Sequence, residues 1–343
     1  IRNQQRSLEK PVQGLNNLYL HVTFACLLSC SHCYARAGKH NHQHLPVENV
    51  RLASLEAARL GFRQSVITGG EPLVHPDRDQ LLEMLADIRE RCHPLQTMLR
   101  SSFALEMSDD LLRRTGTAVD KLVISLDGDQ PTHDARRGED SYDLTVRNLR
   151  RLVELGYDTN LSLAAVLPHE AINGKPGESL RSLAGELQIQ QVRFRPMLPL
   201  GRAAASGMQI QPETIWEHLD PREMISYGFS PNVACGIGQN LYVEPDGEAY
   251  PCYAWHGPQW QLGSITAENG LQSIIGSAKF RELSTHTVNT NHMCRNCVLR
   301  YLCGGACRAW NRQPAEWQTD LDSPPSDCTT LHKRARSIML GAL

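Results

Sequence analysis

The chain has 343 residues, enough for two domains, and its formal net charge of −2 excludes the basic excess expected of a nucleic-acid-binding protein. No apolar run approaches the length of a membrane span, and the polar residues 1–10 do not resemble a signal peptide, so we expect no membrane partner. These features predict a cytoplasmic location, which is reducing. In such a compartment the eleven cysteines are better interpreted as metal ligands than as disulfides.

Hydrophobic periodicity predicts strands that alternate with helices over about the first 200 residues. Strands are expected at residues 17–23, 64–68, 96–100, 121–126, 159–166 and 191–195. Helices are expected at residues 47–60, 108–114 and 141–155, after Asp77, and between the last two strands. Such alternation indicates an α/β fold built on a parallel sheet with right-handed crossovers.

Three cysteines follow the first strand: Cys26, Cys30 and Cys33, separated by three residues and then by two. Thiolates are the ligands that iron–sulfur clusters select, and a [4Fe–4S] cube has four irons. Three thiolates therefore leave one iron open for a substrate or cofactor. A zinc site or a chance cluster of buried thiols is the alternative.

This spacing, with the His-Cys-Tyr ending at Tyr34, resembles the signature of the radical S-adenosyl-L-methionine (SAM) superfamily. The resemblance implies a partial (β/α)6 TIM-like barrel, open on one side for substrate. It also implies a [4Fe–4S] cluster on Cys26, Cys30 and Cys33, with SAM bound at the free iron and Tyr34 close to the cofactor. One electron from that cluster would split SAM into methionine and a 5′-deoxyadenosyl radical, which abstracts hydrogen from a substrate C–H bond.

The second strand ends in Gly69-Gly70-Glu71-Pro72, where two glycines allow a sharp bend and a close approach to a ligand. One βα unit after the cysteine loop, this segment resembles the GGEP motif of the superfamily. The resemblance implies that Gly69, Gly70 and Glu71 contact the amino group of SAM.

Polar residues also follow the fourth strand, at the sheet edge where α/β folds place ligand sites. Ser125, Asp127 and Arg137 resemble family residues that touch the ribose and carboxylate of SAM. The alternative is a hydrogen-bonded turn before a helix.

Seven further cysteines follow residue 230, and residues 241–250 read as a hairpin around Pro245-Asp246-Gly247. The pattern resembles the SPASM domain of radical SAM maturases, which carries two auxiliary [4Fe–4S] clusters and would bring the total to three. The resemblance implies one cluster on Cys235, Cys252 and Cys307, and a second on Cys294, Cys297, Cys303 and Cys328. A structural zinc module is the alternative.

We expect an extension at 1–16, the barrel at 17–200, a linker at 201–230 and the SPASM domain at 231–343.

Tyr253 directly follows Cys252. Sulfatase-maturing relatives carry a catalytic aspartate at this place, so the tyrosine puts formylglycine formation by that route in doubt. A tyrosine has an ordinary pKa near ~10 and needs retuning to act as a base. Tyr253 is thus a candidate catalytic base, with a hydrogen-bonded aromatic wall as the alternative.

We therefore predict a radical SAM enzyme that modifies a ribosomally made peptide or protein side chain by crosslinking, oxidation or decarboxylation. The same chemistry on a sugar, nucleoside or tetrapyrrole is the alternative, and a non-enzymatic electron carrier is a third. Only about fifteen residues precede the first strand, too few for a leader-recognition domain, which favours either a separate recognition protein or a small substrate. The expected partners are therefore the substrate, a reductant such as flavodoxin or ferredoxin, and a separate peptide-recognition protein.

Overall fold

The protein is described here by a computed structural model, which covers residues 14–158, 160–198, 200–206 and 236–300, together with residues 328, 332, 333 and 336. Three predicted cluster ligands, Cys235, Cys303 and Cys307, lie outside these residues, as do most of the predicted linker and the boundary at residue 231. Within the described ranges, no helix combines the length and the apolar character needed to cross a bilayer.

Six parallel strands form the body of the fold. They are β1 (Leu15–Thr23), β2 (Phe62–Gly69), β3 (Gln96–Ser101), β4 (Lys121–Ser125), β5 (Leu161–Leu167) and β6 (Gln191–Pro196). Each strand pairs with the next one in the chain, as in the pairing of Leu18 with Ser65 between β1 and β2. The predicted α/β partial barrel is confirmed, and its sheet remains open because β6 has a single neighbour.

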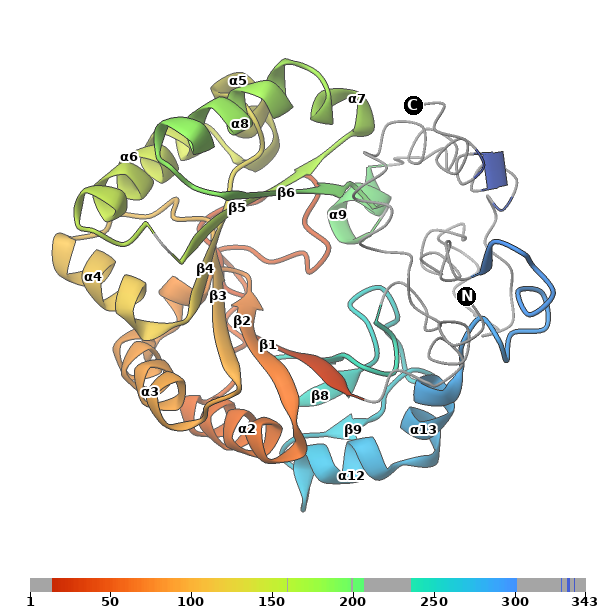
Figure 1. The fold of residues 1–343 in the computed structure, drawn as a ribbon. Helices are drawn as coiled ribbons and strands as arrows, with labels where there is room; N and C mark the ends of the chain where they lie inside the picture. Colours follow the sequence, from red (N-terminus) through yellow and green to blue (C-terminus); the bar gives the residue numbers. More distant parts are fainter. Residues whose placement is uncertain are drawn as a thin grey trace.

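Helices connect these strands and cover the outer side of the curved sheet (Figure 1). They are α2 (Val47–Leu60), the 3-10 helix η1 (Pro72–Val74), α3 (Arg78–Arg91), α4 (Asp109–Ala118), α5 (Gln130–Arg137), α6 (Ser141–Glu154), α7 (His169–Ile172) and α8 (Lys175–Glu186). The predicted helix at 47–60 is confirmed at both ends, while α4 runs four residues past the predicted end at 114.

The strands have two unlike faces because successive side chains of a strand point to opposite sides. In β1, Leu18, Leu20 and Val22 are fully buried in the main core with the helices. Tyr19 lies on the opposite side and packs against a smaller cluster formed by Val66, Met98 and Val123. We call this second side the inner face, and it is where the carboxyl ends of the strands bring polar residues together.

The C-terminal hairpin extends the same sheet. Strand β7 (Leu241–Val243) pairs in parallel with β1, and β8 (Glu248–Tyr250) and β9 (Gly263–Ser264) follow in antiparallel fashion. The hairpin prediction is confirmed, but the sequence did not indicate that β7 lies beside β1. A continuous sheet of nine strands therefore joins the two predicted domains.

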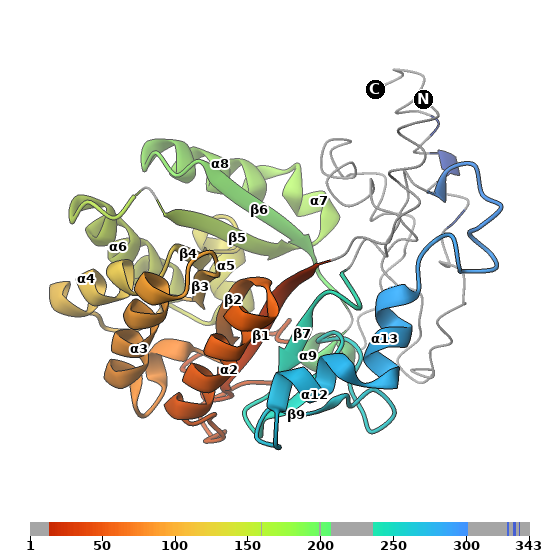
Figure 2. The ribbon, with the colours of Figure 1, turned by 60° about the horizontal axis from the view of Figure 1, so that its bottom comes forward.

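Two helices pack beyond the hairpin, α12 (Gly270–Gly276) and α13 (Ala278–Thr285) (Figure 2). Glu56 of α2 accepts hydrogen bonds from the backbone N–H groups of Leu271 at 3.0 Å and Gln272 at 2.9 Å. A carboxylate at a helix N-terminus is favourable because it meets unpaired N–H donors. This contact fastens the C-terminal part to the barrel.

Candidate functional site

The first cysteine loop begins at Cys26, three residues after the last residue of β1. The side chains of Cys26 and Cys30 are 9% and 8% exposed, and all three of its cysteines are free thiols. Burial, followed by the nearby Glu71 carboxyl, raises the pKa of Cys26 to about 12, and burial also raises the pKa of Cys30. These thiols therefore keep their protons until a metal displaces them, as expected for cluster ligands.

Arg202 contacts this loop from α9 (Gly201–Ala205), the short helix that follows β6. Its Nε donates to the Cys30 carbonyl at 2.7 Å, and its Nη1 donates to the Ala37 carbonyl at 2.8 Å. Gly201 adopts φ 55°, and a Cβ there would lie 2.3 Å from the Cys33 carbonyl oxygen. The Gly-Arg pair is visible in the sequence, but its contact with a loop about 170 residues away is not.

Gly69 and Gly70 press the end of β2 against the chain that enters the cysteine loop. The Gly70 N–H donates to the Thr23 carbonyl at 2.6 Å. An added Cβ on Gly70 would lie 2.1 Å from the Ala25 oxygen, and one on Gly69, at φ 140°, would lie 2.3 Å from the Thr23 oxygen. The close approach that requires glycine here is therefore to the protein's own backbone.

The Glu71 side chain is 2% exposed, and both of its carboxylate oxygens have partners within the protein. Four groups donate to them: the Leu73 N–H at 3.1 Å, the Ser101 hydroxyl at 2.8 Å, and the Ser102 N–H and hydroxyl at 2.7 Å each. Burial raises the pKa of Glu71, while these hydrogen bonds oppose the shift. Glu71 thus fixes the loop after β2 against the loop after β3.

Asp127 and Arg137 form a buried ion pair beside the cysteine loop. The Arg137 guanidinium donates to Asp127 at 2.7 and 3.2 Å, and the Val166 N–H donates to the same carboxylate at 2.8 Å. Burial alone would raise the pKa of Asp127, but Arg137 first, and then His32, hold it well below its usual range. Asp127 is 0% exposed, so its carboxylate is engaged within the protein.

His32 connects this ion pair to the cysteine loop. It lies between Cys30 and Cys33, and its Nε2 is 3.4 Å from an Asp127 oxygen. Burial lowers the pKa of His32 to about 3, so the ring is neutral near pH 7. Ser125, the third residue predicted in this group, ends β4 with a partly exposed side chain.

Tyrosine rings join the two cysteine loops on the inner face. Tyr34 lies 5.0 Å from Tyr253 between ring centroids, and Tyr253 lies 5.5 Å from Tyr242. Tyr242 stacks on Tyr19 at 4.2 Å, and the Tyr34 hydroxyl lies 3.1 Å from His21 Nε2. The predicted residues Tyr34 and Tyr253 are thus brought together. No sequence motif marks Tyr19, His21 and Tyr242. Only the alternation of side chains along the strands could have predicted that they lie on this face.

The cysteine sites share one local geometry. In Cys26, Cys252 and Cys297, the sulfur accepts a hydrogen bond at 3.4 Å from the backbone N–H of the residue two positions later in the chain. Hydrogen bonds to thiolate sulfur tune iron–sulfur clusters, so the three sites fit this cofactor. His332, which the sequence reading missed, places its Nε2 3.2 Å from the Cys297 sulfur. Cys294 and Cys328, in the described part of the chain, are both partly buried.

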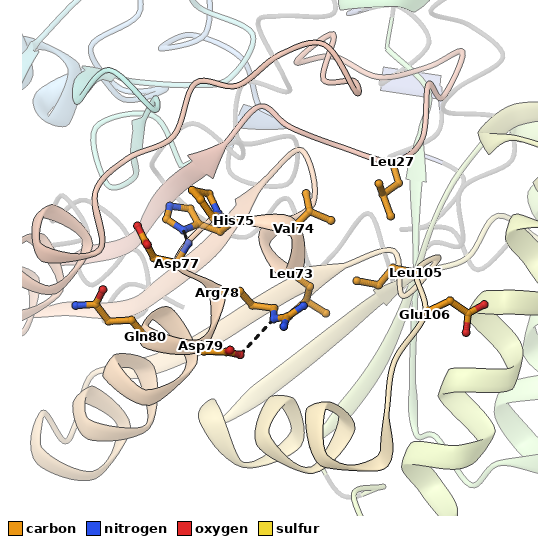
Figure 3. A pocket seen from close by; sticks show the side chains of 11 residues that line it. Leu27, Leu73, Val74, His75, Asp77, Arg78, Asp79, Gln80, Leu105 and Glu106 are labelled. Atoms are coloured by element: carbon orange, nitrogen blue, oxygen red, sulfur yellow. Dashed lines mark hydrogen bonds and ion pairs between the residues drawn. The ribbon is translucent and has the colours of Figure 1, made fainter.

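A surface cavity of about 590 Å³ lies beside the first cysteine loop (Figure 3). Leu27, which is 44% exposed, lies on one side, and Arg78 pairs with Asp79 at 3.4 Å on the other. Its lining consists of Leu27, Leu73, Val74, His75, Pro76, Asp77, Arg78, Asp79, Gln80, Leu105 and Glu106. No predicted site residue is among them, so the candidate site remains on the inner face.

Comparison with known families and proteins gives the following matches. The profile of the Radical SAM superfamily matches residues 20–173, and that of SPASM, an iron–sulfur cluster-binding domain, matches residues 235–298. Both descriptions favour iron–sulfur clusters over the zinc alternatives. Mycofactocin maturase MftC of Mycobacterium tuberculosis is 24% identical, over 97% of this chain and 86% of the relative.

Two solved structures share the fold. One is anSMEcpe with bound AdoMet, with a TM-score of 0.71 and 14% identity over 94% of this chain and 97% of that one. The other is Streptococcus suis SuiB bound to its precursor peptide SuiA, with a TM-score of 0.65 and 15% identity over 90% and 75%.

Proposed function

Because the chain belongs to the radical SAM superfamily and carries a SPASM iron–sulfur domain, we propose that this enzyme is a maturase of a ribosomally made peptide. MftC is named a maturase, and SuiB was solved with a precursor peptide. The observation that carries the proposal is the placement of Tyr34 against Tyr253, because it makes the two cysteine loops face one position on the inner face.

We assign three [4Fe–4S] clusters to the chain. The SAM-binding cluster would be held by Cys26, Cys30 and Cys33. The auxiliary clusters would be held by two sets of ligands, Cys235, Cys252 and Cys307 for one and Cys294, Cys297, Cys303 and Cys328 for the other. When bound and reduced, the first cluster supplies the electron that splits SAM into methionine and a 5′-deoxyadenosyl radical.

The chain's own groups fix the geometry of this reaction. Arg202 holds the carbonyls of the cysteine loop, and Glu71 holds the Gly69–Gly70 turn beside it. Arg137 is oriented by Asp127 and brings positive charge next to Cys30, which suits contact with the SAM carboxylate. The remaining role is assigned to Tyr253, whose ring walls the space between the cysteine loops and whose hydroxyl is the candidate base.

The partners follow from the same chemistry. The cluster needs one electron per cleavage, which a flavodoxin or ferredoxin would supply. A separate protein would present the peptide. Cysteines that hold iron–sulfur clusters rather than disulfides favour a reducing compartment such as the cytoplasm.

The test uses the anaerobically reconstituted full chain. Analysis should give about twelve iron and about twelve sulfide per chain, for three cubes of four. With dithionite and SAM the protein should release 5′-deoxyadenosine, and mass spectrometry should detect a mass change in a short peptide encoded beside the gene.

Matched cysteine variants give this test its control. Cys26→Ala should abolish 5′-deoxyadenosine formation, whereas Cys92→Ala should retain it, because Cys92 lies at the end of α3 and packs against the main core. Equal loss in both variants, or release of 5′-deoxyadenosine without any modified peptide among the neighbouring gene products, would contradict the assignment.

A further inference from the structure

Arg202 is bonded to two of the residues that carry the first set of cluster ligands. Its Nε donates to the Cys30 carbonyl at 2.7 Å, and its backbone N–H donates to the Cys33 carbonyl at 3.0 Å. Its Nη1 donates to the Ala37 carbonyl at 2.8 Å, on the chain that leaves the loop. Two nitrogens of the guanidinium group therefore hold its charge beside the cysteine loop.

The charge of Arg202 is not offset by a carboxylate among the described residues. Each group to which it donates is a neutral carbonyl oxygen. Arg137 and Arg136, by contrast, share the Asp127 carboxylate, at 2.7 and 3.8 Å. The stretch 10–47, which contains the whole loop, has no acidic residue of its own. Arg202 thus brings an uncompensated positive charge to the loop.

Water screens this charge only in part. The Cys30 side chain is 8% exposed, and Arg202 is half-buried. An interaction between charges is stronger where water is excluded, because less solvent screens it. The guanidinium charge therefore acts on any group that the Cys30 sulfur binds.

We propose that Arg202 raises the reduction potential of the first [4Fe–4S] cluster. The net charge around a cluster is one of the factors that set its potential. Reduction adds one negative charge to a cluster that already carries three thiolates, so a fixed positive charge stabilises the reduced form more than the oxidised form. Arg202 is in this sense a positioning residue, because its contacts are to the backbone of the loop. The inference rests on the proposed function, since it requires the cluster on Cys26, Cys30 and Cys33.

The experiment is a potentiometric titration of the anaerobically reconstituted full chain, followed by electron paramagnetic resonance. The signal that changes on addition of SAM belongs to the first cluster, which separates it from the auxiliary clusters. Arg202→Gln removes the charge and keeps hydrogen-bonding atoms. Its SAM-sensitive cluster should be reduced with an equilibrium constant about tenfold lower, which is a potential about 59 mV more negative.

Two further variants separate the charge from the hydrogen bonds. Arg202→Lys keeps the charge and loses the planar fork, so its potential should stay close to that of the parent. Arg36→Gln is the matched control, because the Arg36 N–H also donates to the Cys33 carbonyl, at 3.4 Å, while its side chain is exposed to water. Solvent screening should leave the potential of this variant nearly unchanged.

A stronger reductant should compensate for the lost charge. With dithionite, Arg202→Gln should release less 5′-deoxyadenosine from SAM than the parent does. Titanium(III) citrate, which is more strongly reducing, should restore the yield, because the variant cluster is harder to reduce but intact. A yield that stays low with both reductants would show that the variant has a damaged loop and not a shifted potential.

Three potentials would overturn the proposal: an unchanged value in Arg202→Gln, an equal shift in Arg202→Lys, or an equal shift in Arg36→Gln. Should Arg202→Gln fail to assemble the cluster, Arg202→Lys decides. An unchanged potential there supports the charge, and a shift of about 59 mV contradicts it. Failure of the proposed function is distinguishable, since a parent chain without a SAM-sensitive signal lacks the first cluster. A shifted signal without any modified peptide contradicts the maturase alone.

Discussion

The two cysteine loops differ in what holds them. The Cys26–Cys33 loop is fixed by segments distant in the chain: Arg202 bonds its carbonyls, and the Arg136 carbonyl accepts from the Ser31 N–H at 2.8 Å. The Cys252 loop is closed by the Trp255 N–H, which donates to the Cys252 carbonyl at 3.0 Å, and its Tyr253 ring packs on Tyr242 of β7 and on Tyr34. The first site therefore depends on the whole barrel, whereas the second depends on its hairpin and on the pairing of β7 with β1.

The largest effect should come from Asp127→Asn, which removes the negative partner of the buried Arg137. Breaking a buried ion pair from one side typically costs about 3–5 kcal/mol, so the free energy of unfolding, measured by urea titration, should fall by that order. SAM cleavage should fall with it, because His32 and Arg137 lose their orientation. Product assays for 5′-deoxyadenosine check this second effect.

Asp129→Asn is the control for that change. Asp129 caps α5, with its carboxylate accepting from the Thr132 N–H at 3.3 Å. Asparagine caps a helix about as well as aspartate, so stability should change little. A comparable loss in both variants would show that Asp127 is no more important than a surface cap.

A smaller effect is expected from Gly70→Ala. The new methyl group would overlap the Ala25 oxygen, and relieving such overlap costs about 1–3 kcal/mol. The shift displaces the backbone that enters the cysteine loop, so the iron content and SAM cleavage of the reconstituted chain should both fall. Gly38→Ala is the control, since its Cβ would meet only the Ser29 hydroxyl at 3.9 Å. Full cluster occupancy in Gly70→Ala would contradict this prediction, because it would show that the backbone around Ala25 can shift without disturbing the cysteine loop.

The smallest effect concerns the second region and depends on pH. Burial, followed by Asp246, raises the pKa of Glu244 from 4.5 to about 7, while His256 contacts it at 3.2 Å. A carboxyl group with a raised folded-state pKa stabilises the fold below pH 4.5, and that contribution is lost as pH rises through 7.

Glu244→Gln removes this dependence. The free energy of unfolding of the variant, measured by urea titration at each pH, should therefore rise relative to that of the parent as pH rises from about 4.5 to about 7. We expect a relative gain of roughly 1–2 kcal/mol after discounting for the exposed part of the side chain. SAM cleavage by the first site should be unaffected. A constant difference across the pH range would show that Glu244 titrates normally.

The sequence predicted the barrel well because the information needed was local. Buried runs such as Leu18–Val22 and the stripe of α2 have the periods of a strand and a helix, and Pro245-Asp246-Gly247 marks a turn. The cysteine and glycine motifs also gave the position of the site along the chain.

What the sequence did not predict depends on contacts between distant segments. Glu71 was expected to face the cofactor, but its four donors come from β3, the loop after it and η1. The partner of Asp127 on β5, the Val166 N–H, has no motif of its own. The roles predicted for these residues toward SAM remain predictions.

The pairing of β7 with β1 has a consequence for synthesis on the ribosome. β1 lies near the start of the chain, yet one of its two edges is filled by Leu241–Val243. More than two hundred residues must therefore be made before the Leu18–Leu20 segment gains its second neighbour. Until then the nascent barrel carries an open hydrogen-bonding edge, which is the kind of surface that chaperones protect from aggregation.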